Sequence, residues 1–111
     1  MMAKLALAAT LALYAMTAQA DTIEEPELFT YNMSQIIAVA VMCERELTKE
    51  VVYMGNAALT AATVQLGKDK FSAISDQAML DLIAEQKGDR AQWCFGKVMA
   101  VEASYSMDIY K

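Results

Sequence analysis

The chain has 111 residues, a formal net charge of −5, two cysteines and no histidine. This length supports a single domain. An acidic chain without a cluster of Lys and Arg is a poor candidate for binding nucleic acid or anionic membranes, and the lack of histidine excludes Ser-His-Asp and Cys-His catalysis and the usual zinc sites.

Residues 1–20 are predicted to be a secretory signal peptide. Lys4 supplies the positive charge, residues 5–16 form an apolar stretch, and residues 18–20 read Ala-Gln-Ala, a cleavage site of the A-x-A type. A transmembrane anchor would need about 20 apolar residues, which is more than this stretch has. Removal of Lys4 with the leader changes the net charge from −5 to −6. We therefore expect a periplasmic or secreted protein that does not insert into a membrane after the leader is removed.

Two segments follow the leader: residues 21–31, an acidic N-terminal arm, and residues 32–111, a helical domain. The arm contains Pro26, the single proline of the chain, and four acidic residues, as is typical of a loose, solvated segment. The first helix is predicted to begin near residues 30–34, where three side chains are suitable N-caps: Thr30, Asn32 and Ser34.

Apolar residues at helical spacing accompany both cysteines. Within residues 34–48 the row consists of Ile36, Ala40, Cys43 and Leu47. Near the C-terminus the matching row consists of Cys94, Val98, Val101 and Tyr105. Two helices that each carry an inward-facing cysteine predict a Cys43–Cys94 disulfide in an exported chain; two free thiols or pairing with another chain are the alternatives. The disulfide would close a loop of about 50 residues and add roughly 4 kcal/mol of stability.

The first apolar row continues to Leu66 at spacings of three and four. It predicts either one long helix or two helices that meet near Gly55-Asn56, and we favour a bend or break there because glycine costs about 1 kcal/mol inside a helix. Four alanines in this stretch form a shallow surface that another helix could approach: Ala57, Ala58, Ala61 and Ala62. A homodimer through this alanine face is compatible with the sequence.

Two more helices are predicted after Gly67 and a polar connector at residues 68–70. The first has Ser75 as its N-cap and ends at Gly88, and its predicted buried side chains are Met79, Leu80 and Ile83. The second begins near Asp89 and runs towards Tyr105. The predicted fold class is therefore all-α, a small bundle of three or four helices with one disulfide.

No residue pattern predicts a catalytic, cofactor-binding or metal site, and we expect no enzymatic activity. Glu44, Glu46 and Glu50 lie among basic residues, as on a solvated helix face. The six methionines after residue 20 lack the close spacing of Cu(I) sites and are expected to fill the core or form a pliable contact surface. Three aromatic residues are candidate anchors for a partner: Trp93, Tyr105 and Tyr110.

We expect the protein to act by binding another exported or envelope protein, as an inhibitor, an immunity factor or an envelope adaptor. The alternative is an acid-stress chaperone that exposes apolar surface when its carboxylates are protonated at low pH. The chain resembles small periplasmic acid-stress chaperones in size, export and the wide spacing of two helix-borne cysteines, and shares no motif with them.

Overall fold

The computed structural model describes residues 23–111, so the predicted signal peptide lies outside the described residues. Four helices account for most of the described chain: α2 (Pro26–Met42), α3 (Lys49–Leu66), α4 (Lys68–Glu85) and α5 (Arg90–Tyr105). The prediction of a small all-α bundle with one disulfide is confirmed. None of the helices between residues 23 and 111 is long and apolar enough to cross a membrane.

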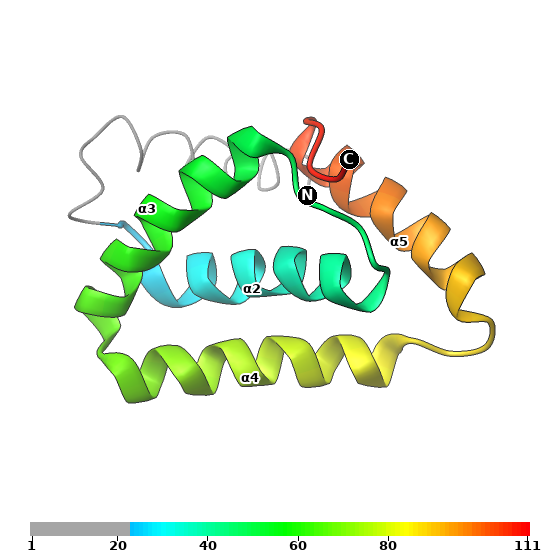
Figure 1. Cartoon of the computed structure of the whole chain (residues 1–111). Coiled ribbons are helices and arrows are strands. Elements are labelled where there is room, and N and C mark those ends of the chain that lie inside the picture. The colour runs from blue at the N-terminus through cyan, green and yellow to red at the C-terminus, as the bar shows by residue number, and fades with distance from the viewer. Residues whose placement is uncertain (1–22) are drawn as a thin grey trace.

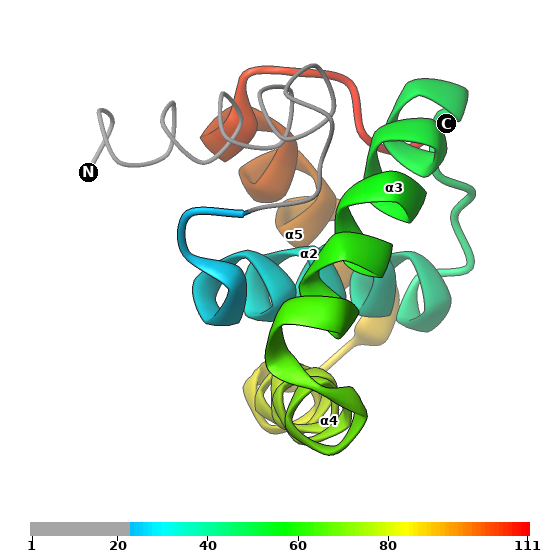
Figure 2. The same cartoon turned by 90° about the vertical axis from the view of Figure 1, so that its left-hand side faces the viewer.

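α2 is the central helix of the bundle. In Figure 1, α3, α4 and α5 form a triangle around it. α4 packs beneath α2, and Figure 2, which looks along α4, shows α2 crossing it at an angle. Fully buried side chains line the inside of this arrangement, among them Val39 of α2 and Leu82 of α4. The C-terminal segment, residues 106–111, closes the triangle where Tyr110 forms an antiparallel bridge with Leu47.

α2 begins inside the predicted N-terminal arm. Pro26 lies in its first turn, where a missing N–H costs nothing and the fixed φ of proline suits the helix. Phe29 and Thr30 are already buried. The segment predicted as a loose arm is therefore helical from Pro26 onwards, and the predicted helix start near residues 30–34 is wrong.

α2 ends at Met42, and residues 43–48 form a loop before α3 that the apolar periodicity did not predict. The N–H of Arg45 donates to the carbonyl of Ala40 at 2.9 Å, and Glu44 adopts the left-handed conformation with φ 51°. Together these features form a Schellman motif, which usually has glycine in the left-handed position. Cys43 thus lies just after α2, and the predicted helix through residues 34–48 is wrong beyond Met42.

α3 passes unbroken through Gly55, contrary to the predicted bend. A Cβ atom at Gly55 would lie 2.6 Å from the Met33 Cε, so the bare glycine backbone allows α2 to approach α3 closely. Three of the four alanines of the predicted alanine face are buried in the core: Ala58, Ala61 and Ala62. These three alanines therefore pack inside the bundle, and Ala57 is the one alanine of the predicted face that is exposed.

α4 begins directly after Gly67, so the predicted polar connector is part of the helix. Its buried residues are Ala78 and Leu82, and the predicted Met79 packs partly buried against the core, whereas the predicted Leu80 and Ile83 are 57% and 53% exposed. Ser75, predicted as an N-cap, lies inside the helix, where its hydroxyl is 2.9 Å from that of Ser34 on α2. The helix therefore turns a different face to α2 from the one predicted.

α5 follows its prediction closely. Asp89 is the residue before the first helical position, as expected. Val98 is buried, and the other members of the predicted row lie partly buried against the core or form the disulfide: Cys94, Val101 and Tyr105. The helix ends with Ser106 in the left-handed conformation, at φ 55°.

Candidate functional site

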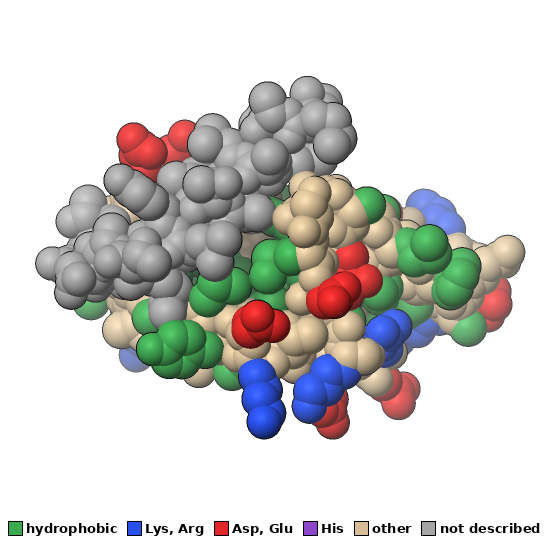
Figure 3. All heavy atoms as spheres, turned by 90° about the horizontal axis from the view of Figure 1, so that it is seen from above, with side chains coloured by type: hydrophobic (Ala, Val, Ile, Leu, Met, Phe, Trp, Pro, Cys, Tyr) green, Lys and Arg blue, Asp and Glu red, His purple; other side chains and the backbone are tan. Residues whose placement is uncertain are grey.

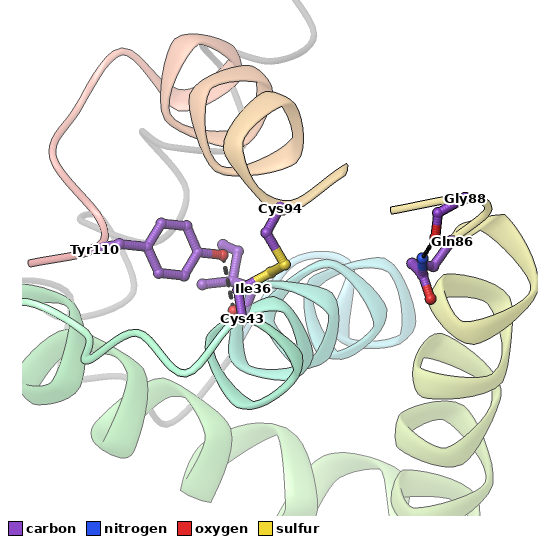
Figure 4. The surroundings of a disulfide bond; sticks show 6 residues. All are labelled: Ile36, Cys43, Gln86, Gly88, Cys94 and Tyr110. Carbon is purple, nitrogen blue, oxygen red and sulfur yellow. Dashed lines mark hydrogen bonds between the residues drawn. A yellow bond between two sulfur atoms is a disulfide. The ribbon is translucent and has the colours of Figure 1, made fainter. Parts of the chain in front are cut away.

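The Cys43–Cys94 disulfide joins the end of α2 to the first half of α5 (Figure 4). The two Cα atoms are 5.6 Å apart. This confirms the predicted pairing and shows that the bridge ties α5 to the central helix, although α3 and α4 separate the two cysteines in the sequence. The disulfide thereby positions the C-terminal segment that follows α5.

Tyr110 lies in the core next to this bridge. It is 5% exposed, and its hydroxyl donates a hydrogen bond of 2.8 Å to the carbonyl of Ile36 (Figure 4). Burial, with a smaller contribution from the negative charge of Glu102, raises the pKa of the Tyr110 phenol above its ordinary value. The prediction that Tyr110 anchors a partner is therefore corrected, because its ring and its hydroxyl are both engaged inside the protein.

Glu102 and Arg45 hold the C-terminal segment in place. The Oε2 atom of Glu102 accepts hydrogen bonds of 2.9 Å from the N–H groups of both Ile109 and Tyr110. From the loop between α2 and α3, Arg45 donates two hydrogen bonds, of 2.9 and 2.7 Å, to the main-chain oxygen of Lys111. A carboxylate and a guanidinium therefore fix the segment through charge-assisted hydrogen bonds.

An apolar pocket of about 60 Å³ lies between the first half of α2, the first half of α3 and the C-terminal segment. Its larger apolar lining residues are Leu28, Phe29, Met33, Met54, Tyr105 and Met107. Glu25 and Asn32 are polar side chains in the lining. Concave apolar sites with a few polar groups are the usual form of a binding site, so this pocket is the candidate functional site.

The three predicted aromatic anchors are not brought together. Tyr105 lines the pocket, and burial raises the pKa of its phenol. Trp93 lies in the first turn of α5 and packs, half-buried, against the core. Only one of the three predicted residues thus contributes to the pocket.

Three methionines in the pocket lining were not predicted as site residues: Met33, Met54 and Met107. They come from three segments of the chain that are far apart in the sequence. The expectation that the methionines form either core or a pliable contact surface was the one signal that pointed towards them, and it could not single out which ones meet.

A polar network outside the pocket joins α2 to α4. The Tyr31 hydroxyl donates to the carboxylate of Asp81, and the Gln77 amide donates to the same carboxylate at 2.7 Å. These two hydrogen bonds, that of Tyr31 foremost, lower the pKa of Asp81. The same bond to Asp81, with burial and the nearby negative charges, raises the pKa of Tyr31 to about 12. The hydrogen bond between Tyr31 and Asp81, which joins the two helices, is therefore the largest cause of both shifts.

Charged side chains of both signs are interspersed on the surface seen in Figure 3, in the part not drawn in grey. The carboxylates of the predicted acidic cluster are exposed, and Glu46 pairs with Lys111 at 3.2 Å. Within residues 23–111, no group of three His, Cys, Asp or Glu side chains is placed to hold a metal ion.

Comparisons of the chain with protein-family models, curated proteins and solved structures found no match in any of the three.

Proposed function

We propose that the protein binds another exported protein and takes an apolar side chain of that partner into the pocket between α2, α3 and the C-terminal segment. The composition of the pocket carries this proposal: its lining is almost wholly apolar and contains three methionines. Methionine side chains are flexible and polarisable, and they adapt to the shapes of different partners. Burial of an apolar side chain contributes about 25 cal/mol per Å² of area removed from water.

The charge around the pocket indicates what else the partner carries. Glu25 lines the pocket, the neighbouring Glu24 is exposed, and the chain is acidic as a whole. Complementary charge favours encounter and selects between partners. The proposed partner therefore presents an apolar anchor flanked by Lys or Arg. An inhibitor, an immunity factor and an envelope adaptor could each bind in this way.

Site-specific photo-crosslinking tests the proposal. A photoreactive residue is placed at Leu28, which lines the pocket and is 39% exposed, and at Leu80, which lies on α4 outside the pocket and is 57% exposed. Each chain is expressed with its own leader and irradiated in cells. We expect a discrete adduct from position 28 that is absent from position 80, and mass spectrometry identifies its second component.

The affinity for the purified crosslinked partner is then measured by calorimetry. Gly55→Ala forces the end of the Met33 side chain to move, because the new Cβ would lie 2.6 Å from the Met33 Cε. Both residues line the pocket, so we expect the displaced side chain to change the shape of the pocket. We expect this variant to remain folded, since alanine favours a helix by about 1 kcal/mol over glycine, and to bind at least about tenfold more weakly. Leu28→Glu should weaken binding as well, and Leu80→Glu serves as the matched control.

Two results would contradict the proposal. One is equal crosslinking from positions 28 and 80, which would mean that contact is not directed to the pocket. The other is unchanged affinity in both Gly55→Ala and Leu28→Glu, which would mean that the partner binds elsewhere.

The second candidate, an acid-stress chaperone, is favoured by one observation. Glu102 holds Ile109, and both Ile109 and Met107 line the pocket. The chain has fourteen Asp and Glu residues and no histidine, so acid leaves it strongly cationic, and charge repulsion would then loosen this wall of the pocket and expose apolar surface. Glu102→Gln weakens the hold on the same wall by replacing charge-assisted hydrogen bonds with neutral ones, and we expect it to shift the rise in ANS fluorescence to a higher pH than in the wild type. ANS fluorescence that stays flat in both proteins down to about pH 2 would rule out this function.

A further inference from the structure

Thioether sulfur is the one class of metal-binding atom that the described chain gathers at the pocket. The chain has no histidine, its two cysteines are joined in the disulfide, and within residues 23–111 no three carboxylates are placed to share a metal ion. Three methionines line the same space of about 60 Å³: Met33, Met54 and Met107. Their sulfurs keep lone pairs available for a metal, because a thioether is only a weak hydrogen-bond acceptor.

Gly55 brings the first two of these side chains to one place. The Sδ atom of Met33 lies 4.0 Å, and its Cε atom 2.6 Å, from the position that a Cβ atom of Gly55 would take. The Met33 thioether therefore lies against the turn of α3 that carries Met54, the residue next to Gly55. Met33 is 7% exposed, so the surrounding core holds its side chain at this turn.

The C-terminal segment supplies the third methionine. The N–H of Met107 donates to the carbonyl of Glu102 at 3.3 Å, and two residues further on the N–H of Ile109 donates to the Glu102 carboxylate. The main chain of Met107 is thus fixed, whereas a methionine side chain has three rotatable bonds, so the three sulfurs can turn towards a common point. Closeness in the fold here replaces the close sequence spacing that the methionines lack.

We propose that the pocket binds one soft monovalent metal ion, Cu(I) or its chemical analogue Ag(I), through the sulfurs of Met33, Met54 and Met107. Thioether ligands select Cu(I), whereas Mg²⁺ and Ca²⁺ prefer oxygen ligands and Zn²⁺ is bound by imidazole, thiolate and carboxylate. A single charge also costs less to remove from water than a double one, and Glu25 in the lining adds a compensating negative charge. The composition of the pocket therefore favours a soft monovalent ion over the common divalent ones.

This metal site goes beyond the proposed function and is tested separately from it. A metal ion and an apolar side chain of a partner would take the same space, so they would exclude each other. The metal is added to the isolated chain, without a partner. A negative result there leaves the crosslinking from position 28 unaffected, and a negative crosslinking result leaves the metal site unaffected.

Calorimetric titration of the disulfide-bonded chain with silver nitrate, in a buffer without chloride, tests the metal site. Ag(I) keeps its oxidation state during the titration, and the disulfide leaves no thiol to bind it. We expect one ion per chain, bound at least about a hundredfold more tightly than by N-acetylmethionine amide, because the fold holds three ligands together at a high effective concentration.

NMR of the methionine methyl groups, labelled with carbon-13, identifies the ligands in the wild-type chain. Six methionines follow residue 20. On addition of one equivalent of Ag(I), we expect the methyl signals of Met33, Met54 and Met107 to shift and those of the other three to stay. Met99 is 57% exposed, so it is the thioether that Ag(I) would meet first if binding followed accessibility alone.

Substitution by leucine removes one sulfur and nearly conserves the side-chain volume. Met33→Leu, Met54→Leu and Met107→Leu should each weaken Ag(I) binding at least about tenfold, whereas the matched control Met99→Leu should leave it unchanged. Circular dichroism checks that each variant is folded. Three results would overturn the proposal: binding no tighter than by N-acetylmethionine amide, methyl shifts confined to methionines outside the pocket, or a triple leucine variant that binds Ag(I) like the wild type.

Discussion

At the residue scale, the hydrogen bond between Tyr31 and Asp81 shows how a polar pair at the edge of an apolar interface joins two helices, α2 and α4. Asp81 lies on α4 at the edge of the interface and accepts hydrogen bonds from Tyr31 of α2 and from Gln77 one turn earlier on its own helix. Such bonds to an ionised carboxylate are stronger than bonds between neutral groups. The contribution of this pair to stability must therefore depend on pH.

We predict that the effect of Tyr31→Phe on stability shrinks as the pH falls. The folded-state pKa of Asp81 is below its ordinary value of 3.8, so the stabilisation is present above that value and is lost as the pH falls through the lowered one. The variant should be less stable than the wild type near pH 7, and the difference should narrow towards about pH 2. Urea unfolding of both proteins across this pH range measures the difference between their free energies of unfolding.

The exposed Tyr53 provides the control, since Tyr53→Phe should change the free energy of unfolding little at any pH. At the alkaline end the sign is reversed for Tyr31 itself. Its folded-state pKa is raised from 10.0 to about 12, so its stabilisation is present below pH 10 and is lost as the pH rises through about 12. A Tyr31→Phe effect that is the same near pH 7 and near pH 2 would show that the ionisation of Asp81 plays no part.

At the element scale, α4 shows why a helix can be predicted without its buried face. Apolar side chains occupy two adjacent sides of this helix, so the spacing of Met79, Leu80 and Ile83 fits a buried stripe as well as that of Ala78 and Leu82 does. The choice depends on the surface of α2 on which the helix packs, which the periodicity of α4 does not contain. Ala78 is fully buried there, and its carbonyl accepts a hydrogen bond from Gln35 of α2 at 3.5 Å.

Two neighbouring leucines of α4 therefore should respond very differently to truncation. Leu82 is fully buried, and we predict that Leu82→Ala lowers the free energy of unfolding by about 2–5 kcal/mol through lost burial and a cavity. Leu80 is 57% exposed, and Leu80→Ala should stay within about 0.5 kcal/mol of the wild type. Chemical denaturation measures both. Similar losses in the two variants would mean that α4 does not pack through the face assigned to it.

Local sequence signals placed some helix boundaries and misplaced others, because Ser75 lies inside α4 and Pro26, in the segment predicted as a loose arm, begins α2. Asp89 marks the start of α5 as expected. The break after α2 depends on Glu44, which adopts a left-handed conformation that is more usual for glycine. Gly55 does not break α3, and its missing side chain leaves room for Met33 of α2. The pocket was beyond prediction because its walls come from three distant segments, including the C-terminal segment held by Glu102.

At the scale of the whole molecule, the triangle around α2 depends on how its last side is attached. α5 follows α4 through residues 86–89, packs on α2, and is joined to the end of α2 by the disulfide. The C-terminal segment depends on the same attachment, because Glu102 of α5 holds Ile109 and Tyr110. One covalent bond therefore supports both the third side of the triangle and a wall of the pocket.

We predict that Cys43→Ala/Cys94→Ala loosens these parts first and lowers the overall stability. The cysteines are 51 positions apart, and the loss of a crosslink over such a loop costs roughly 4 kcal/mol in the chain-entropy model, a large share of the about 5–15 kcal/mol that holds a small domain together. In native-state hydrogen exchange, the amides of α5 and of residues 106–111 should lose more protection than those of α2 and α4. Wild-type protein treated with a reducing agent should behave like the double variant, which separates the loss of the bond from the loss of the sulfur atoms.

If the double variant keeps the wild-type stability and exchange pattern, non-covalent packing alone positions α5. If it loses protection evenly across all four helices, the bundle opens as one unit and α5 is not its separately attached side.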